Sequence, residues 1–425
     1  MKFAIITHVQ HIKNDSQYFG YAPYIREMNI WLQHVDEVIV VAPLVNKELN
    51  PIHEKYCHTK LRFLTVSEFN ITSAANFFKA LFKLPKGFST VYLAMSQADH
   101  IHLRCPGNMG LIGALVQILF PNKQKTAKYA GNWDPKSKQP WSYRLQKWIL
   151  STTFLTRNMQ VLVYGEWPNQ TKNIKPFFTA TYGVDEIQNS EFRIQNKLSL
   201  QSESITTESD FDFAQSDKKD NNSLSLRAES RTTENGLDSA RLDKIEIDLP
   251  PTSFLFVGTL SKGKQPLYAI QLVEKLYQHG KKVRLNLYGD GILRPTLETY
   301  IKQNSLQDII FLRGNQSKES VLKAYQTSHF LILPSKSEGW PKVVAEAMFW
   351  GCVPIASPVS CVPFMMGNGS RGIILKEKLH NDVNQIRNVL NNQEVYKKMA
   401  LDGQTWSRQF TTDKFETEIC KLLKY

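Results

Sequence analysis

Two glutamates, Glu338 and Glu346, stand eight positions apart in the stretch SEGWPKVVAEAMFWG. The apolar run FLILPS just before it predicts a buried strand, and Pro341 is typical of the first turn of a helix. Glu338 is therefore expected on the loop at the carboxyl end of a strand. Glu346 is expected about one and a half turns into the helix that follows, and Gly351 is expected to end that helix.

This placement favours a particular class of ligand. In open α/β sheets, ligands bind outside the carboxyl ends of the strands. The N-terminus of the following helix offers free backbone N–H groups and a positive dipole end, which suit a phosphate. The two carboxylates suit hydroxyl groups instead. A nucleotide sugar, which has phosphates and many hydroxyls, fits this combination.

A structural alternative exists for Glu346. It follows Lys342 by four residues, so the two could form a surface ion pair that contributes about 0.3 kcal/mol. However, the helical pattern places Glu346 at the edge of the apolar stripe of Val343, Ala347 and Trp350. A half-buried position of this kind is unusual for a solvated charge, which favours the ligand interpretation.

The pattern around these residues predicts two α/β domains. In the first half of the chain, short apolar runs at 3–7, 38–42, 100–103, 126–130 and 161–165 alternate with helix candidates at 24–33, 110–120 and 141–150. Residues 250–402 repeat the alternation, with strands expected at 253–258, 282–289, 309–314, 330–335 and 352–357. Alternation of this kind predicts doubly wound parallel sheets covered by helices on both faces. The expected domains are residues 1–190 and 250–402. A helix within 403–425 follows, and its return to the first domain is left open.

Residues 195–248 differ from both domains. This segment is acidic, rich in Ser, Thr and Asn, and poor in aromatic residues, which predicts a disordered linker. It is interpreted as a tolerated insertion, with a regulatory or docking segment as the alternative. The triplet Asp210-Phe211-Asp212 has the form of a DxD metal–nucleotide motif, but in this context we interpret it as a chance match.

The charge of the chain limits the function classes. With 52 Lys and Arg against 39 Asp and Glu, the 425 residues carry a formal net charge of +13, which suggests anionic partners. The positive charge is divided between the two α/β domains, and no nucleic-acid-binding motif accompanies it, so nucleic acid is not expected. A dehydrogenase would need a complete Gly-rich fingerprint after the first strand, which this sequence lacks.

The five cysteines are odd in number, widely spaced and without a CxxC pair. This argues against a disulfide framework or a zinc site and favours a reducing compartment. No apolar run approaches the roughly 20 residues of a spanning helix. A cytoplasmic protein is expected. Attachment to the inner, anionic face of a membrane is left open, because residues 76–88 and 138–150 interleave aromatic and basic side chains. The alternative is that these helices pack their apolar faces in the core.

The stretch PSKSEGWPKVVAEAMFWGCVPIAS resembles the E-x7-E signature of family-4 glycosyltransferases of the group 1 type, as found in bacterial surface-polysaccharide synthesis. FVGTLSKGKQPLYAI is similar to the donor loop of that family, and LYGDGILRPTLE, IIFLRGN and GSRGIIL are similar to its next units. The N-terminal half matches more loosely, through DSQYFGYAPYIREMNIWL and ADHIHLRCPGN. The resemblance covers nearly all of the chain outside the 195–245 bridge. It implies the GT-B fold, in which two Rossmann-like domains face a cleft.

The resemblance also implies roles for the donor-side residues. Glu346 would hold the ribose hydroxyls, and Glu338 would contact the transferred sugar. Lys264 would stabilise the charge that grows on the leaving diphosphate, which is an electrostatic role. The implied donor site comprises Gly20, Gly258, Thr259, Lys264, Gly314, Glu338, Gly339, Trp340, Pro341, Val344 and Glu346. Gly20 matches the glycine of the family's loop after the first strand, where the backbone comes close to the ligand.

The chain departs from the family at one donor position. The residue after the strand glycine is commonly an arginine that acts as a second phosphate clamp, but here it is Thr259. Lys262 and Arg313 are candidates to replace that cation. The other interpretation is a different pose of the donor.

On the N-terminal side, His102 matches a cleft histidine of the family that is thought to contact the transferred sugar. The implied catalytic set is therefore Lys264, Glu338 and His102. Strand alternation puts Arg104 on the same face as His102. Two further residues follow another strand end, and the expected acceptor-binding set is Arg104, Asn132 and Asp134.

The resemblance implies transfer with retention of configuration and without a metal or other cofactor. The sequence offers no compelling carboxylate nucleophile for a double displacement, so a front-face substitution is the more economical mechanism. The implied partners are a nucleotide-sugar donor and a glycan or polyprenol-linked acceptor, as in polysaccharide, capsule or lipopolysaccharide synthesis. The alternative is a catalytically silent protein that binds a nucleotide sugar.

Overall fold

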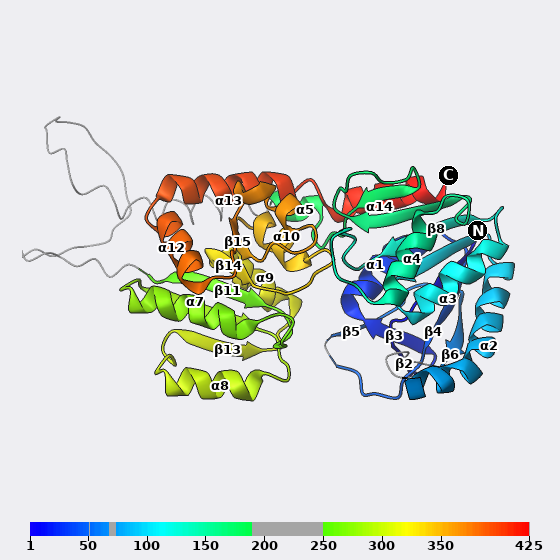
Figure 1. Cartoon of the computed structure of the whole chain (residues 1–425), viewed down its shortest axis with the longest axis horizontal. Helices are drawn as coiled ribbons and strands as arrows, with labels where there is room; N and C mark the ends of the chain where they lie inside the picture. Colours follow the sequence, from blue (N-terminus) through cyan, green and yellow to red (C-terminus); the bar gives the residue numbers. More distant parts are fainter. Residues whose placement is uncertain (51, 68–73, 189–249, 425) are drawn as a thin grey trace, which may run out of the picture.

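The computed structural model describes residues 1–50, 52–67, 74–188 and 250–424, with only the backbone for 74–84. The expected linker of 195–248 and the Asp210–Asp212 triplet lie outside these ranges. Figure 1 shows two lobes side by side, with the N-terminal lobe in blue to green and the C-terminal lobe in green to orange.

The N-terminal domain is built on a parallel sheet of seven strands in the order β10-β9-β8-β7-β1-β4-β6. Its strands are β1 (Lys2–Ile6), β4 (Glu37–Pro43), β6 (Leu61–Val66), β7 (His100–Cys105), β8 (Gln124–Tyr129), β9 (Met159–Tyr164) and β10 (Ile174–Phe177). Its helices are α1 (Ala22–Leu32), α2 (Ala74–Gln97), α3 (Asn108–Val116), the 3-10 turn η1 (Gln117–Leu119) and α4 (Trp141–Ser151). All five expected strands are present, because continuous apolar runs are typical of strands buried on both faces.

A small antiparallel sheet is formed by β2 (His11–Asn14) and β3 (Gln17–Tyr21), which lie between β1 and α1, and by β5 (His53–Lys55), which lies between β4 and β6. The sequence analysis missed it, because its strands are short and partly polar. Gly20 was expected on the loop after the first strand, but it lies within β3, opposite His11. A Cβ atom there would meet Ile25 Cδ1 at 3.0 Å, so close packing against α1 explains this glycine.

The C-terminal domain repeats the architecture on a parallel sheet of six strands in the order β13-β12-β11-β14-β15-β16. Its strands are β11 (Thr252–Val257), β12 (Val283–Tyr288), β13 (Ile310–Gly314), β14 (Phe330–Leu333), β15 (Val353–Ala356) and β16 (Ile373–Ile374). Its helices are α7 (Pro266–Gln278), α8 (Arg294–Gln303), α9 (Lys318–Thr327), α10 (Lys342–Phe349), α11 (Val362–Met365), the 3-10 turn η2 (Gly367–Gly369), α12 (Leu379–Leu390) and α13 (Gln393–Ser407). The expected α/β fold class with two Rossmann-like domains of GT-B type is confirmed.

The chain passes between the domains twice. After β10 it reaches the short helix α5 (Val184–Gln188), and after α13 it returns to the N-terminal domain as α14 (Thr412–Leu423). Thr411 caps α14 by accepting a hydrogen bond from the backbone N–H of Lys414. Figure 1 shows α14, in red, lying on the N-terminal lobe, where His34 Nε2 is 2.9 Å from Glu416 Oε1.

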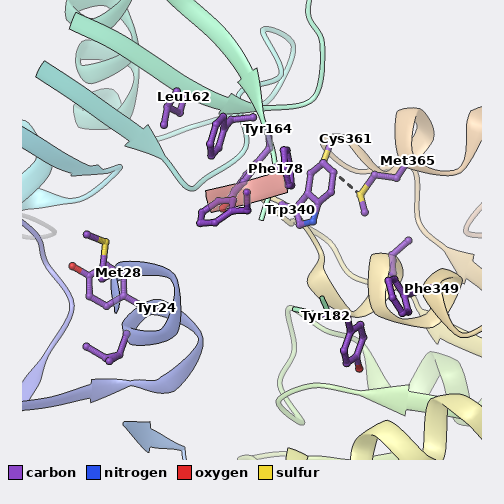
Figure 2. Close-up of a cluster of buried hydrophobic side chains, with 14 of the residues drawn as sticks. Tyr24, Met28, Leu162, Tyr164, Phe178, Tyr182, Trp340, Phe349, Cys361 and Met365 are labelled. Atoms are coloured by element: carbon purple, nitrogen blue, oxygen red, sulfur yellow. Dashed lines mark hydrogen bonds between the residues drawn. The ribbon is translucent and has the colours of Figure 1, made fainter. Parts of the chain in front are cut away.

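An apolar core continues across the boundary between the domains. Trp340 of the C-terminal domain packs against Tyr164 of the N-terminal domain, with ring centroids 5.8 Å apart. Nearby, Tyr182 packs against Phe349 at 5.0 Å. Figure 2 shows Trp340 close to Tyr164 at this boundary, and Tyr182 beside Phe349 further into the C-terminal side. The domains are therefore held together by buried apolar surface as well as by polar contacts.

Candidate functional site

The loops that follow β11 and β14 meet at the switch point of the C-terminal sheet. These two strands are neighbours from which the strand order runs in opposite directions, which is where ligands bind in open α/β sheets. Lys264 on the first loop and Glu338 on the second form an ion pair, with Nζ 2.6 Å from Oε1. The lysine side chain is 30% exposed and the glutamate side chain 9%. The structure thus brings together two predicted site residues that are 74 positions apart.

Glycines bring the backbone close at the same edge of the sheet. A Cβ atom at Gly289 would lie 2.1 Å from the carbonyl oxygen of Gly258, which no side chain could tolerate. The N–H of Gly289 donates to the carbonyl of Gly314 at 2.8 Å. This close approach accounts for Gly289, whereas Gly258 and Gly314 have φ angles of 155° and 69°, which favour glycine.

Glu346 lies on α10, and both of its carboxylate oxygens accept hydrogen bonds. Thr181 Oγ1 donates to Oε1 at 2.8 Å, and the Tyr325 hydroxyl donates to Oε2 at 3.0 Å. Burial, together with the nearby Glu346, raises the pKa of Tyr325 well above its usual value, so this hydroxyl stays a donor. Lys342, the alternative ion-pair partner, donates instead to the carbonyl of Pro23 in the other domain at 3.3 Å.

The residues between the two glutamates face the N-terminal domain. A Cβ atom at Gly339 would lie 2.4 Å from the carbonyl oxygen of Ala130. Trp340 is only 8% exposed and Pro341 is buried. The side chain of Val344 is fully buried, and its N–H donates to the carbonyl of Pro341. The side chains of Trp340 and Val344 therefore present no surface to a ligand in this structure, contrary to the expectation for Val344.

The two candidates to replace the missing arginine lie in different places. Thr259 and Lys262 are exposed on the loop after β11. Arg313 lies at the end of β13, two strand spacings, or about 10 Å, from β11. Its Nε donates to Asn286 Oδ1 at 2.9 Å, and its guanidinium stacks over Phe311.

The expectation that His102 contacts the transferred sugar is wrong for this structure. β7 continues to Cys105, so His102 lies in the middle of the strand and not at its end. Its ring is 1% exposed, and its centroid is 4.8 Å from that of Trp31. Its Nδ1 lies 2.9 Å from Thr126 Oγ1. Burial lowers the pKa of His102 to about 3, so this histidine is a neutral core residue.

Arg104, two residues further along β7, belongs to a buried charge cluster. Its Nη1 is 3.3 Å from Glu27 Oε1, and Lys128 Nζ is 3.8 Å from the same oxygen. Thr179 Oγ1 donates to Glu27 Oε2 at 3.3 Å. Burial opposes ionisation of Glu27, but Lys128 and Arg104 lower its pKa to about 2. Burial lowers the pKa of Lys128 to about 7.

The sequence analysis missed Glu27 and Lys128 as members of this cluster. A clue was present in both cases. Glu27 stands on the face of α1 that carries the buried residues Tyr24, Met28 and Trp31, and Lys128 stands inside a strand of buried residues. A charge in a buried pattern usually has a partner, but the partner comes from another element.

The two other residues expected to bind the acceptor lie on the loop after β8 and bond within it. Asn132 Oδ1 accepts from the N–H of Asp134 at 2.9 Å, and Asp134 Oδ1 accepts from the N–H of Lys136 at 2.8 Å. Lys147 Nζ of α4 donates to the carbonyls of Trp133 and Asp134. These contacts define the shape of the loop.

Three further findings concern the described parts of the chain. All five cysteines are free thiols. Among the described residues, no group of three or more His, Cys, Asp or Glu side chains is placed to hold a metal ion. None of the helices outside the undescribed ranges is long and apolar enough to cross a bilayer.

Comparisons with known proteins agree with this fold. Residues 240–406 match the family model of group 1 glycosyl transferases. An uncharacterized glycosyltransferase of Methanocaldococcus jannaschii is 30% identical over 161 residues, which are 38% of this chain and 44% of that protein. A putative colanic acid biosynthesis glycosyltransferase of Salmonella typhimurium is 28% identical over 134 residues, 30% of this chain and 33% of that protein. The matched region thus spans less than half the length of these relatives.

Solved structures resemble the whole chain. The Anabaena protein HepE, solved in complex with UDP, has a TM-score of 0.63 and covers 100% of this chain, with 99% of its own chain covered. The two sequences are 12% identical, so this likeness concerns the fold. The chain therefore has the two-domain GT-B fold, and its C-terminal domain carries the sequence pattern of the group 1 glycosyl transferases.

Proposed function

We propose that this protein is a glycosyltransferase that moves a sugar from a nucleotide-sugar donor to a glycan or lipid-linked glycan, with retention of configuration. The observation that carries the proposal is the ion pair of Lys264 and Glu338 at the switch point of the C-terminal sheet. The pair lies within the region that matches group 1 glycosyl transferases. Glu346 follows on the adjacent helix.

The ion pair suggests how the donor would be bound. A diphosphate can replace the carboxylate as the partner of Lys264, because the lysine remains 30% exposed. Glu338 would then be free to accept hydrogen bonds from hydroxyls of the sugar. Lys264 would stabilise the negative charge that develops on the leaving diphosphate, and we expect this to be its main contribution to the rate.

A front-face substitution is the mechanism that we propose. The bond from the anomeric carbon to the diphosphate breaks while the acceptor oxygen bonds to the same face, and the leaving phosphate takes the acceptor proton. A double displacement would need a carboxylate with a free oxygen on the N-terminal side. Glu27 is a poor candidate, because both of its oxygens have partners within the protein. We propose that the reaction needs no metal, since Lys264 supplies positive charge.

The acceptor is proposed to be membrane-associated. On α4, Trp141 and Trp148 are 55% and 61% exposed, and Arg144 stands exposed between them on the same helix face. α4 packs inward through Ile149 and Leu150, so the tryptophans are not part of its core-facing side. Exposed tryptophan beside arginine suits an anionic bilayer surface. This supports a peripheral cytoplasmic location and a polyprenol-linked acceptor in surface-polysaccharide synthesis.

The test combines binding with turnover. Purified protein is screened by thermal shift against UDP-, GDP-, ADP- and CMP-sugars, with Glu346→Ala as the comparison. We expect one nucleotide class to raise the melting temperature and Glu346→Ala to abolish that rise. The same sugar should then be released or transferred with turnover. Binding without turnover, with lipid-linked acceptors present, would favour the silent nucleotide-sugar-binding protein. The absence of binding by every class would contradict both.

A further inference from the structure

The segment that joins the domains places a hydroxyl on the proposed donor carboxylate. Thr181 lies between the end of β10 and the start of α5, and its Oγ1 donates to Glu346 Oε1 at 2.8 Å. The two residues are 165 positions apart. This contact therefore links the connection between the domains directly to helix α10 of the donor side.

The two partners of Glu346 differ in how they are held. Tyr325 belongs to α9 of the same domain, and its side chain is fully buried. Its hydroxyl can orient the carboxylate, and burial keeps the tyrosine side chain in this position. Thr181 is half-buried and comes from the connecting segment. Of the two residues, Thr181 is the more exposed, and it belongs to the connecting segment and not to the C-terminal domain.

The connecting segment, which runs from the end of β10 to the start of α5, is also hydrogen-bonded to the start of α14, where the chain crosses between the domains a second time. The carbonyl of Tyr182 accepts a hydrogen bond from the N–H of Thr412 at 2.9 Å. The N–H of Val184 donates to Asp413 Oδ2 at 2.9 Å. The hydrogen bond between Thr181 and Glu346 thus lies next to the place where the two chain crossings contact each other. Breaking this bond would affect contacts of both crossings.

We propose that Thr181 is an internal competitor for the donor: its hydroxyl occupies the oxygen of Glu346 that a donor hydroxyl would use, and donor binding displaces it. The proposal rests on the proposed function of Glu346 in holding the donor. Each carboxylate oxygen can accept two hydrogen bonds, so a donor hydroxyl competes with Thr181 when it takes the same position on Oε1. Donor binding would then exchange a bond between the domains for a bond to the ligand.

The competition predicts opposite effects for two hydroxyl deletions on one carboxylate. Thr181→Val removes the competitor while keeping the shape of the side chain, so the affinity for the nucleotide should rise. Tyr325→Phe removes the group that orients Glu346, so the affinity should fall. Hydrogen bonds to charged groups are strong enough for changes of about tenfold in each direction.

The measurement is calorimetric titration with UDP, GDP, ADP and CMP, continued with whichever binds the wild-type protein. The matched control is Thr179→Val, because Thr179 lies on the same segment but donates to Glu27 at 3.3 Å. Thr181→Ser keeps the hydroxyl and should not show the gain. Thr181→Ala provides a second deletion if the valine variant does not fold. Before addition of nucleotide, Thr181→Val should melt at a lower temperature than the wild type.

The outcomes separate this inference from the proposed function. If Glu346→Ala loses binding and Thr181→Val tightens it, both stand. If Glu346→Ala loses binding but Thr181→Val weakens it or leaves it unchanged, Thr181 is not a competitor and only this inference is overturned. If Glu346→Ala binds like the wild type, or if no nucleotide binds the wild type, the proposed donor site fails and the inference fails with it.

Discussion

Each domain carries a lysine–glutamate contact near the carboxyl ends of its sheet, and the two contacts differ in burial. In the C-terminal domain, Lys264 and Glu338 are 2.6 Å apart, with side chains 30% and 9% exposed. In the N-terminal domain, Lys128 and Glu27 are 3.8 Å apart, and their side chains are 1% and 4% exposed. Similar chemistry is therefore present in two different environments.

The difference in solvent exposure indicates which of the two contacts can take part in ligand binding. Lys264 is open to solvent, so water or a phosphate can replace its carboxylate partner. Lys128 is enclosed: its Nζ donates to the carbonyl of Phe178 at 2.8 Å and lies 4.5 Å from the ring centroid of Phe177. We interpret the exposed pair as exchangeable and the buried cluster as a fixed part of the N-terminal domain.

The largest expected effect comes from neutralising each glutamate in turn. Glu27→Gln leaves buried cations without their counter-charge, and the free energy of unfolding should fall by about 3–5 kcal/mol. Glu338→Gln should lower it by about 1 kcal/mol or less, because the lysine can be solvated. Urea denaturation followed by circular dichroism measures both variants. Equal losses for the two variants would contradict the comparison.

The buried histidines of the N-terminal domain should make stability depend on pH. Burial lowers the pKa of His11 to about 4 and that of His102 to about 3, whereas an unfolded chain has values near 6.5. Between these limits the unfolded state binds more protons, so stability falls as the pH falls from about 6.5 towards 4.

A single substitution tests this prediction. His102→Gln should flatten the dependence of the unfolding free energy on pH by up to about 1.4 kcal/mol per pH unit in that window, which corresponds to one proton. Glu27 adds a separate loss at lower pH, since its pKa falls from 4.5 to about 2 on folding. An unchanged slope between pH 6.5 and 4.5 in the variant would show that His102 titrates normally in the folded protein.

The exposed pair should matter for turnover and not for folding. Lys264→Ala should lower kcat roughly a hundredfold, because it removes the charge proposed to stabilise the leaving diphosphate. Its melting temperature should stay within about 2 °C of the wild type. Lys302→Ala is the control, because it removes an exposed lysine from α8 of the same domain. If the two variants lose the same activity, the ion pair has no special role.

The smallest expected effect concerns the outer surface of the N-terminal domain. Replacing Trp141 and Trp148 by alanine should weaken binding to vesicles that contain anionic phosphatidylglycerol by roughly tenfold, since exposed aromatic surface would no longer be buried in the lipid. Vesicle co-sedimentation measures this change. Tyr277→Ala, an exposed aromatic on the C-terminal domain, is the control. Equal weakening by the control would show that the tryptophans form no specific membrane surface.

Much of the fold could be predicted, because it depends on local patterns. Apolar runs between helical patterns indicated the ten expected strands, and Pro341 indicated the start of α10. The antiparallel sheet of β2, β3 and β5 was missed because its strands are short and do not show a clear apolar alternation. This error moved Gly20 from an expected loop into a strand.

Some residues of the candidate site could likewise be placed from the sequence, and others could not. Lys264 and Glu338 each follow a strand of the C-terminal sheet, and the order of the strands brings their loops together, so their proximity followed from the fold class. His102 was misplaced because the end of β7 was expected two residues too early. The cluster around Glu27 was missed because its partners come from β7, β8 and the segment after β10.

The sequence by itself determined the two α/β domains and the placement of Glu338 and Glu346 after a strand and within a helix, because periodicity and turn residues act over a few positions. Only the tertiary structure decided which partner each charged side chain has. Thr181 reaches Glu346 across 165 positions, and Arg104 reaches Glu27 across 77. Such contacts depend on how the elements pack and on how the two folded domains dock through their shared apolar core. This packing cannot be predicted from patterns that extend over only a few residues.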